Sequence, residues 1–202
     1  AFALYDALPD PVPTHWNIRG EADGFTPKPW GAFVIPIVST FTFFLLAAIP
    51  FLARRSFEAE GTRLAYEVST FSILGFLLVI TVVTLLAGAG FPIAIDRVIP
   101  AGIGLLLMIV GGVIARTDPN RFIGIRTRAT LSNEEIWRKT HRLGGKVFAI
   151  AGAIVFAAAI LGASILVLVA TVLIAPVVPI VYAAHLSRKA TFRNGDSSPN
   201  AS

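Results

Sequence analysis

Long apolar runs separated by short polar segments dominate the pattern of this chain. Three of them are separate from one another, at Trp30–Leu52, about 66–87 and about 98–115. Each has about the 20 residues that an α-helix needs to cross the hydrocarbon core of a bilayer. A fourth run, 147–186, is about twice as long, so it predicts two helices joined by a tight turn near residues 162–164. The pattern therefore predicts five complete membrane-spanning helices.

The first 29 residues do not fit this pattern. Residues 1–7 look like the end of a further helix, and residues 8–29 are rich in proline and glycine, which favour extended chain and turns. Because the chain opens on Ala1 rather than methionine, we expect a hydrophobic segment upstream.

The predicted fold class is all-α, a polytopic transmembrane bundle with five full spans and a partial N-terminal one. We expect five regions: 1–29, a helix end plus outer loop; 30–115, three membrane helices; 116–146, a basic insert; 147–186, a transmembrane hairpin; and 187–202, a disordered tail.

Composition supports a membrane protein. Of the 202 residues, 55% are hydrophobic and 14% are charged, whereas soluble domains carry about 25% charged residues. The chain has no cysteine, which excludes disulfides and cysteine-ligated metals. No ionisable residue falls near the middle of a predicted span, and this argues against a proton-coupled transporter.

The basic residues orient the predicted spans. Arg19, Lys28 and Arg97 lie in loops on one side, whereas the other 14 of the 17 lysines and arginines lie on the opposite side, eight of them in 116–146. The positive-inside rule then places the insert and the C-terminus in the cytoplasm and residues 8–29 outside. The net charge of +5 therefore favours anionic lipid headgroups over nucleic acid. We expect a multi-pass protein of the plasma membrane.

The outer segment holds the first candidate site. His15 with Asp10, Glu21 and Asp23 offers imidazole and carboxylate groups of the kind that ligate divalent cations. No two of these residues have a spacing that fixes them as a ligand pair, so three interpretations stay open. His15 holds the loop in place by a hydrogen bond, the segment contacts a peptide, or it binds a metal. The candidate outer contact residues are Asp10, His15, Asn17 and Glu21.

The basic insert predicts a short amphipathic helix. Ser132 followed by Glu135 fits a capping box, so we expect a helix over about 134–143 lying in the headgroup layer. Gly144 and Gly145 would then let the chain turn into the next span.

The candidate residues inside are Asn120, Arg126, Arg128, Trp137 and His141. A catalytic base at His141 would need a nucleophile or a metal, and the sequence offers neither nearby. We therefore expect an interfacial histidine that is hydrogen-bonded to the backbone or to a lipid phosphate. The arginines suit an acidic partner protein, a phosphorylated ligand or simply lipid headgroups.

Small residues in the spans predict close helix packing. They include Gly102, Gly104, Gly111 and Gly112. Four prolines interrupt the helical hydrogen bonding and open polar backbone locally, at Pro36, Pro50, Pro176 and Pro179.

Two sequence patterns resemble a known family. The insert pattern is made of Pro119-Asn120, Phe122, Gly124, Arg126-Thr127, Thr130, Ser132-Asn133, Trp137, Thr140-His141 and Gly144. It resembles the shared segment of the SdpI family, bacterial membrane proteins known for immunity to a secreted killing toxin and for toxin-linked signalling. The outer pattern, Leu8-Pro9, Pro13, His15 and Gly20, resembles a short domain of unknown function that often precedes that segment. Arg128 departs from the family, whose members tend to carry a bulky or aromatic residue there.

The resemblance implies a role in toxin immunity or signalling. A peptide would be recognised outside, and the insert would hold or release a cytoplasmic regulator, which in the family is a transcriptional repressor. Neither catalysis nor a cofactor is expected. Two alternatives stay open: an accessory subunit of a larger membrane assembly, and a metal-dependent enzyme or carrier built around His15.

Overall fold

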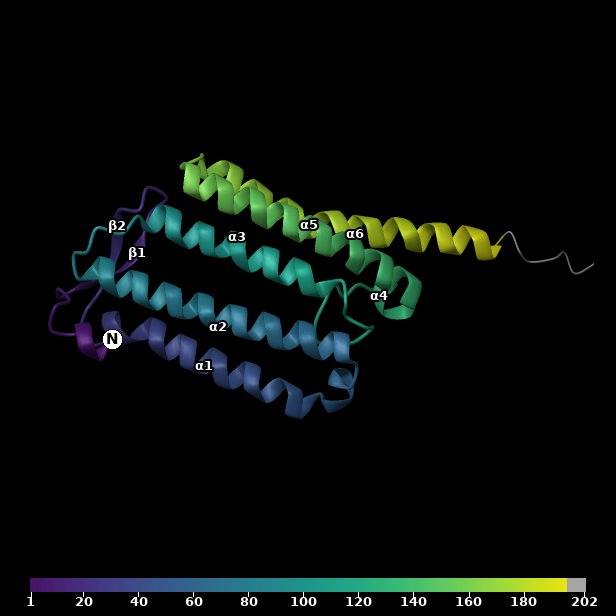
Figure 1. Cartoon of the computed structure of the whole chain (residues 1–202), viewed down its shortest axis with the longest axis horizontal. Coiled ribbons are helices and arrows are strands. Elements are labelled where there is room, and N and C mark those ends of the chain that lie inside the picture. Colours follow the sequence, from purple (N-terminus) through teal and green to yellow (C-terminus); the bar gives the residue numbers. More distant parts are fainter. Residues whose placement is uncertain (196–202) are drawn as a thin grey trace, which may run out of the picture.

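The computed structural model describes residues 1–195, which form a bundle of long helices with a small two-stranded sheet at one end (Figure 1). The elements are the 3-10 helix η1 (Phe2–Leu4), strands β1 (Val12–Trp16) and β2 (Ala22–Thr26), helix α1 (Trp30–Leu52), the 3-10 helix η2 (Arg54–Phe57), and helices α2 (Glu60–Gly88), α3 (Ile95–Ile114), α4 (Arg128–Ser132), α5 (Glu134–Leu161) and α6 (Ile165–Gly195).

Five of the helices, α1, α2, α3, α5 and α6, are long and apolar enough to cross a membrane. The prediction of an all-α multi-pass membrane protein with five full spans is confirmed, with the sheet as a minor addition. The predicted turn near 162–164 is also present. Gly162 ends α5 in the left-handed conformation, with φ of 68°, and its N–H bonds back to the last turn of the helix.

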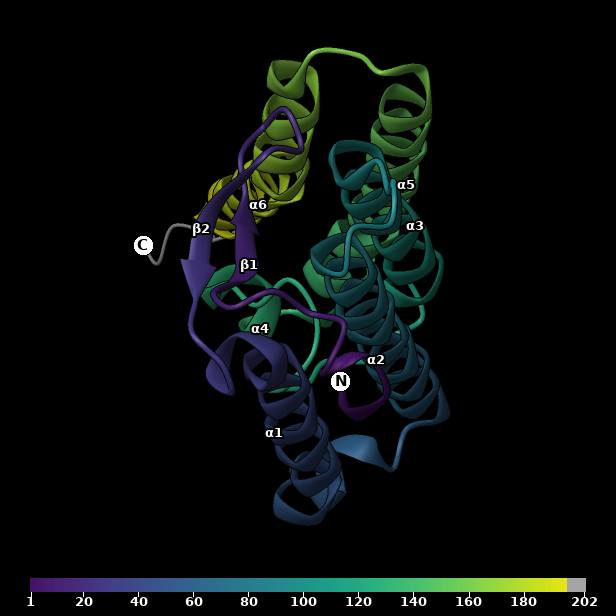
Figure 2. The same cartoon turned by 90° about the vertical axis from the view of Figure 1, so that its left-hand side faces the viewer.

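The long helices alternate in direction, which separates the connecting segments into two groups (Figure 1). The hairpin end carries β1, β2 and the turn between α5 and α6. The insert end carries α4 and the loop 115–127. Figure 2 looks onto the hairpin end, where the sheet lies across the ends of the helices.

Helices α3 and α5 pack through glycines. A Cβ atom on Gly111 would lie 2.7 Å from the carbonyl oxygen of Gly145, and one on Gly152 would lie 2.5 Å from the carbonyl oxygen of Gly104. Such distances leave no room for a side chain, so the two backbones are in direct contact. We call these four residues, Gly104, Gly111, Gly145 and Gly152, the glycine seam.

A second link joins α1 to α2. Pro50 has no N–H, so the carbonyl of Leu46, four residues earlier, loses its usual helical donor. The Tyr66 hydroxyl of α2 donates to that carbonyl instead. A polar group opened by proline within the apolar region is thereby satisfied by the neighbouring helix.

The expectation of a separate amphipathic helix over 134–143 is wrong. Helix α5 runs without a break from Glu134 to Leu161, and Gly144 and Gly145 are buried within it. These glycines serve packing rather than a turn, since Gly145 belongs to the seam and Gly144 lies against Ile125. The predicted boundary between 116–146 and 147–186 therefore falls inside one helix. Its 28 residues span about 42 Å against a hydrocarbon core of about 30 Å, so its first turns extend beyond the core.

The two ends of the chain also differ from expectation. Helix α6 continues to Gly195, so residues 187–195 are helical rather than part of a disordered tail. Residues 196–202 of that predicted tail lie outside the described part of the chain. At the start, residues 1–7 contain the short η1 rather than an α-helical end. The sequence pattern did not predict the sheet.

The glycine seam gives a matched pair of substitutions. We expect Gly111→Ala to lower the free energy of unfolding by about 1–3 kcal/mol, because the new methyl group must push α3 away from α5. Gly112→Ala is the control, since a Cβ there meets nothing within 4 Å. Thermal unfolding of both purified variants in detergent compares them, and an equal effect of the two substitutions would contradict the seam.

Candidate functional site

The sheet is an antiparallel hairpin fixed to the helices by its apolar side. Val12 pairs with Thr26 at its base and Trp16 with Ala22 near its tip. Val12 and Leu8 are buried in a small core with Ala32 of α1 and Leu85 of α2. Leu8 of the Leu-Pro pattern thus anchors the segment, and the polar side chains of the hairpin lie at the surface.

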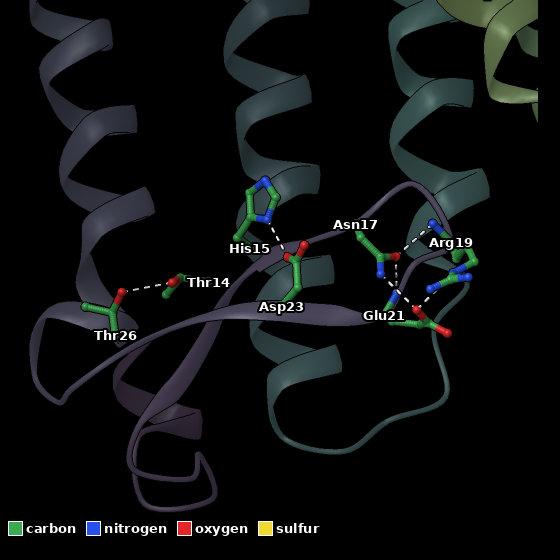
Figure 3. Close-up of polar contacts among 7 residues, drawn as sticks. All are labelled: Thr14, His15, Asn17, Arg19, Glu21, Asp23 and Thr26. Atoms are coloured by element: carbon green, nitrogen blue, oxygen red, sulfur yellow. Dashed lines mark hydrogen bonds and ion pairs between the residues drawn. The ribbon is translucent and has the colours of Figure 1, made fainter.

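The tip of the hairpin holds an ordered polar cluster (Figure 3). The Asn17 side-chain oxygen accepts the backbone N–H groups of Arg19 and Glu21, at 2.8 and 3.1 Å. Its amide nitrogen donates to the Glu21 carboxylate at 2.8 Å, and Arg19 Nε donates to the same oxygen at 3.1 Å. Gly20 turns the chain with φ of 75°. We call Asn17, Arg19 and Glu21 the tip cluster.

The tip cluster favours the ionised form of Glu21. The hydrogen bond from Asn17, and after it the positive charge of Arg19, lower the pKa of Glu21 from its ordinary value of 4.5. Because this carboxylate is exposed, the pKa shift describes the local charge arrangement rather than the stability of the protein.

His15 pairs across the strands. Its Nδ1 lies 2.5 Å from a carboxylate oxygen of Asp23, and the hydroxyls of Thr14 and Thr26 bond at 2.8 Å (Figure 3). Both His15 and Asp23 are largely exposed. Among the described residues no group of three or more metal-binding side chains comes together, so this pair has no further ligand. The geometry fits the interpretation in which His15 stabilises the segment by a hydrogen bond.

The four predicted outer residues do not form one site. Asn17 and Glu21 lie together in the tip cluster, whereas His15 lies further along the strand. Asp10 lies at the base of the hairpin, where its carboxylate accepts the backbone N–H of Lys28 at 3.1 Å.

A cavity of about 310 Å³ lies beside the hairpin tip and was not predicted from the sequence. Three charged side chains line it: Arg19, and Asp96 and Arg97 at the start of α3. The remaining lining comes from the tip and from the α5–α6 turn, with Ile18, Ala159, Gly162, Ala163, Ile165 and Leu168. We call it the tip cavity. The α3 and α5–α6 residues are distant from the hairpin in sequence, so only the fold brings this charged lining together.

At the insert end, Trp137 and His141 are fully buried. Their rings stack with centroids 4.0 Å apart. The indole N–H of Trp137 donates to the Thr117 carbonyl at 2.7 Å. His141 Nε2 accepts the backbone N–H of Ile125 at 2.8 Å, and its Nδ1 lies 2.9 Å from the Trp137 carbonyl oxygen, to which it donates. Both nitrogens of a neutral imidazole are therefore used in holding the loop against α5.

Asn120 closes the same loop. Its side-chain oxygen accepts the N–H groups of Phe122 and Ile123, both at 2.8 Å, and its amide donates to the Asp118 and Ile123 carbonyls. Gly124 then passes over the His141 ring with φ of 117°, where a Cβ would collide with Nε2.

The predicted inner residues thus divide into two groups. Asn120, Trp137 and His141 are buried, so in this conformation their side chains do not face a partner, and the predicted contact role does not fit them. Arg126 and Arg128 are exposed.

Comparison with known proteins finds two family models that match parts of the chain. A family model described as the SdpI/YfhL protein family matches residues 116–183, from the insert loop into α6. The insert and the segment that follows it are thus similar to the SdpI/YfhL family. A second model, a domain of unknown function (DUF1648), matches residues 1–40, which contain the hairpin.

The SdpI resemblance extends over most of the chain. Over 188 residues the chain is 27% identical to the immunity protein SdpI of Bacillus subtilis (strain 168), covering 92% of this chain and 88% of that protein. No solved structure matches the chain. The recognition of the SdpI family from the sequence is confirmed.

The structure gives physical roles to the residues of the SdpI pattern, and it corrects the role expected for Ser132. Ser132 does not cap a helix but ends α4, and its hydroxyl donates to the Ala129 carbonyl. Asn133 caps α5 instead, and Thr127 forms a capping box with Thr130 at the start of α4. Most of the pattern therefore folds the insert rather than forming a contact surface.

We expect His141→Ala to destabilise the protein by about 1–3 kcal/mol, because the partly buried Ile125 amide loses its acceptor. The matched control is His185→Ala, which removes an exposed imidazole of α6. Thermal unfolding in detergent measures both variants. If His141→Ala unfolds at the same temperature as the control, the imidazole does not hold the loop.

Proposed function

We propose that this chain is a multi-pass protein of the bacterial plasma membrane that protects the cell against a secreted peptide, or senses one, at its hairpin end. The Bacillus subtilis protein that is similar to this chain over most of its length is named an immunity protein. The distribution of basic residues favours an outward-facing hairpin end and a cytoplasmic insert and C-terminus.

The observation that carries the proposal is the tip cavity beside the tip cluster. A polar cavity with both signs of charge, open at the surface, suits a flexible peptide with charged groups or a free terminus. Asn17 holds Arg19 and Glu21 by three hydrogen bonds before any partner arrives. This pre-ordering reduces the entropy cost of binding. Recognition and protection by binding need no catalytic group, so the proposed activity is not enzymatic.

A second part of the proposal concerns a cytoplasmic regulator. A cleft of about 370 Å³ lies between the start of α5 and the end of α6, with Lys139, Lys189 and Leu186 in its lining. Glu135 also lines the cleft and pairs with Lys139, and such a mixture of charged and apolar side chains suits an amphipathic segment of a soluble protein. This cleft, rather than the buried Trp137 and His141, is where we place the capture of a regulator. The accessory-subunit alternative stays a prediction, which co-purification of stoichiometric membrane partners would support.

Complementation tests the outer role. A Bacillus subtilis strain lacking its own immunity protein SdpI would express this chain and be exposed to conditioned medium from the parent strain. We expect survival to rise about 100-fold over that of the same strain without this chain. If protection follows binding, this change corresponds to a binding free energy of about 2.7 kcal/mol.

The matched variants locate the site. Arg19→Ala combined with Arg97→Ala removes both positive charges of the tip cavity and should abolish most protection. Arg138→Gln combined with Arg142→Gln, at the insert end, should retain it. Wild-type protein that reaches the membrane in normal amounts without protecting the cells would contradict the proposal.

A further inference from the structure

A cavity of about 510 Å³ opens between α4 and α6 at the insert end. Its charged lining residues are Arg128, at the start of α4, and Arg188, near the end of α6. The other lining residues are Thr127, Ala129, Ser132, Ile180, Ala184 and Ser187. The lining contains two guanidinium groups and no carboxylate. We call it the α4–α6 cavity.

The two arginines differ from Arg138 and Lys139 in the first turns of α5, each of which has a carboxylate partner. Arg138 pairs with Glu134 at 3.2 Å and Lys139 pairs with Glu135 at 2.6 Å. Among the described residues, by contrast, no carboxylate pairs with Arg128 or Arg188 in the folded chain. Two uncompensated positive charges from separate helices on one cavity favour an anion, and guanidinium groups match the paired oxygens of a phosphate.

The lining changes character along α6. Ile180 and Ala184 lie two turns and one turn before Arg188, so an apolar wall of the cavity gives way to a basic one over about 12 Å. Ile180 lies in the apolar part of α6, whereas Arg188 lies in its last turns, directly before Lys189. A ligand that matches this lining has an anionic head and an apolar part directly attached to it.

We propose that the α4–α6 cavity binds one anionic phospholipid of the surrounding leaflet. Its phosphate would lie between Arg128 and Arg188, and its glycerol and first acyl carbons would lie against Ala184 and Ile180. A free phosphate shares the head chemistry, but it would leave the apolar wall of the cavity uncovered. The site does not depend on the proposed immunity role, because it lies at the other end of the bundle.

Lipid retention tests this inference. The full-length protein would be purified in a mild detergent with equal amounts of phosphatidylglycerol and phosphatidylcholine, and the retained lipid counted by native mass spectrometry. We expect wild-type protein to retain one phosphatidylglycerol in preference to phosphatidylcholine. Arg128→Gln combined with Arg188→Gln should weaken this retention about 30-fold, since each charge near an anionic lipid contributes about fivefold.

A charge-matched control separates a site from general attraction. Arg142→Gln combined with Lys146→Gln removes the same charge from exposed positions of α5 outside the cavity lining. It should leave retention unchanged, and thermal unfolding should show that both variants are folded. Equal loss in the two double variants, or no loss in either, would overturn the proposal. Protection of the wild-type protein against unfolding by inorganic phosphate, without retained lipid, would overturn the assignment to a phospholipid and leave a site for a free phosphate.

Discussion

The direct backbone contact between α3 and α5 is the constraint on which the rest of the structure depends. The glycine seam brings the carbonyls of Gly104 and Gly145 within reach of the facing helix, where any side chain would separate the two. The insert loop leaves the end of α3 and returns to the start of α5, so the seam fixes the distance that this loop must bridge. The same pair of helices contributes Arg97 and Gly162 to the tip cavity at the other end. The insert loop and the tip cavity therefore both depend on this antiparallel helix pair.

The insert shows how a strongly patterned segment can be structural. Trp137 and His141 bond to the loop backbone, and Asn120 closes the loop on itself. An irregular loop near the end of a membrane helix has many backbone groups without helical partners, and buried groups of this kind are costly when unpaired. The polar side chains of the pattern supply hydrogen-bond partners for these backbone groups. The basic side chains remain on the surface of the same segment, where they are available for lipid or a partner.

Hydropathy alone predicted the spans well, because a membrane helix must be apolar over a length fixed by the bilayer. The bounds of α1 and the turn at Gly162 follow directly from it. It failed at residues 144–145, where a glycine pair suggested a turn and the structure has a packing contact. From one sequence, a glycine that bends the chain and a glycine that admits a neighbouring helix cannot be told apart. The distinction depends on what faces them.

The sites were predicted less completely for a similar reason. The sequence singled out Asn17 and Glu21, whose neighbours are close along the chain, and they do bond to each other. The hairpin itself had a signal in Val12-Pro-Thr-His-Trp16 and in Gly20, although prolines hid it. Asp96 and Arg97 gave no signal, because they reach the tip cavity only through the packing of α3 against α5. Likewise, Arg128 and Arg188 are distant in sequence, and only the fold places them on one cavity.

The central claim is that the hairpin end faces outward and the insert end faces the cytoplasm. The chain has no cysteine, so single cysteines report side-specific access without background. We would label Arg19→Cys and Arg142→Cys in intact cells with a maleimide that cannot cross membranes, before and after permeabilisation. The account predicts that Arg19→Cys reacts in intact cells and that Arg142→Cys reacts only after permeabilisation. The reverse pattern would contradict it, since a secreted peptide could then not reach the tip cavity.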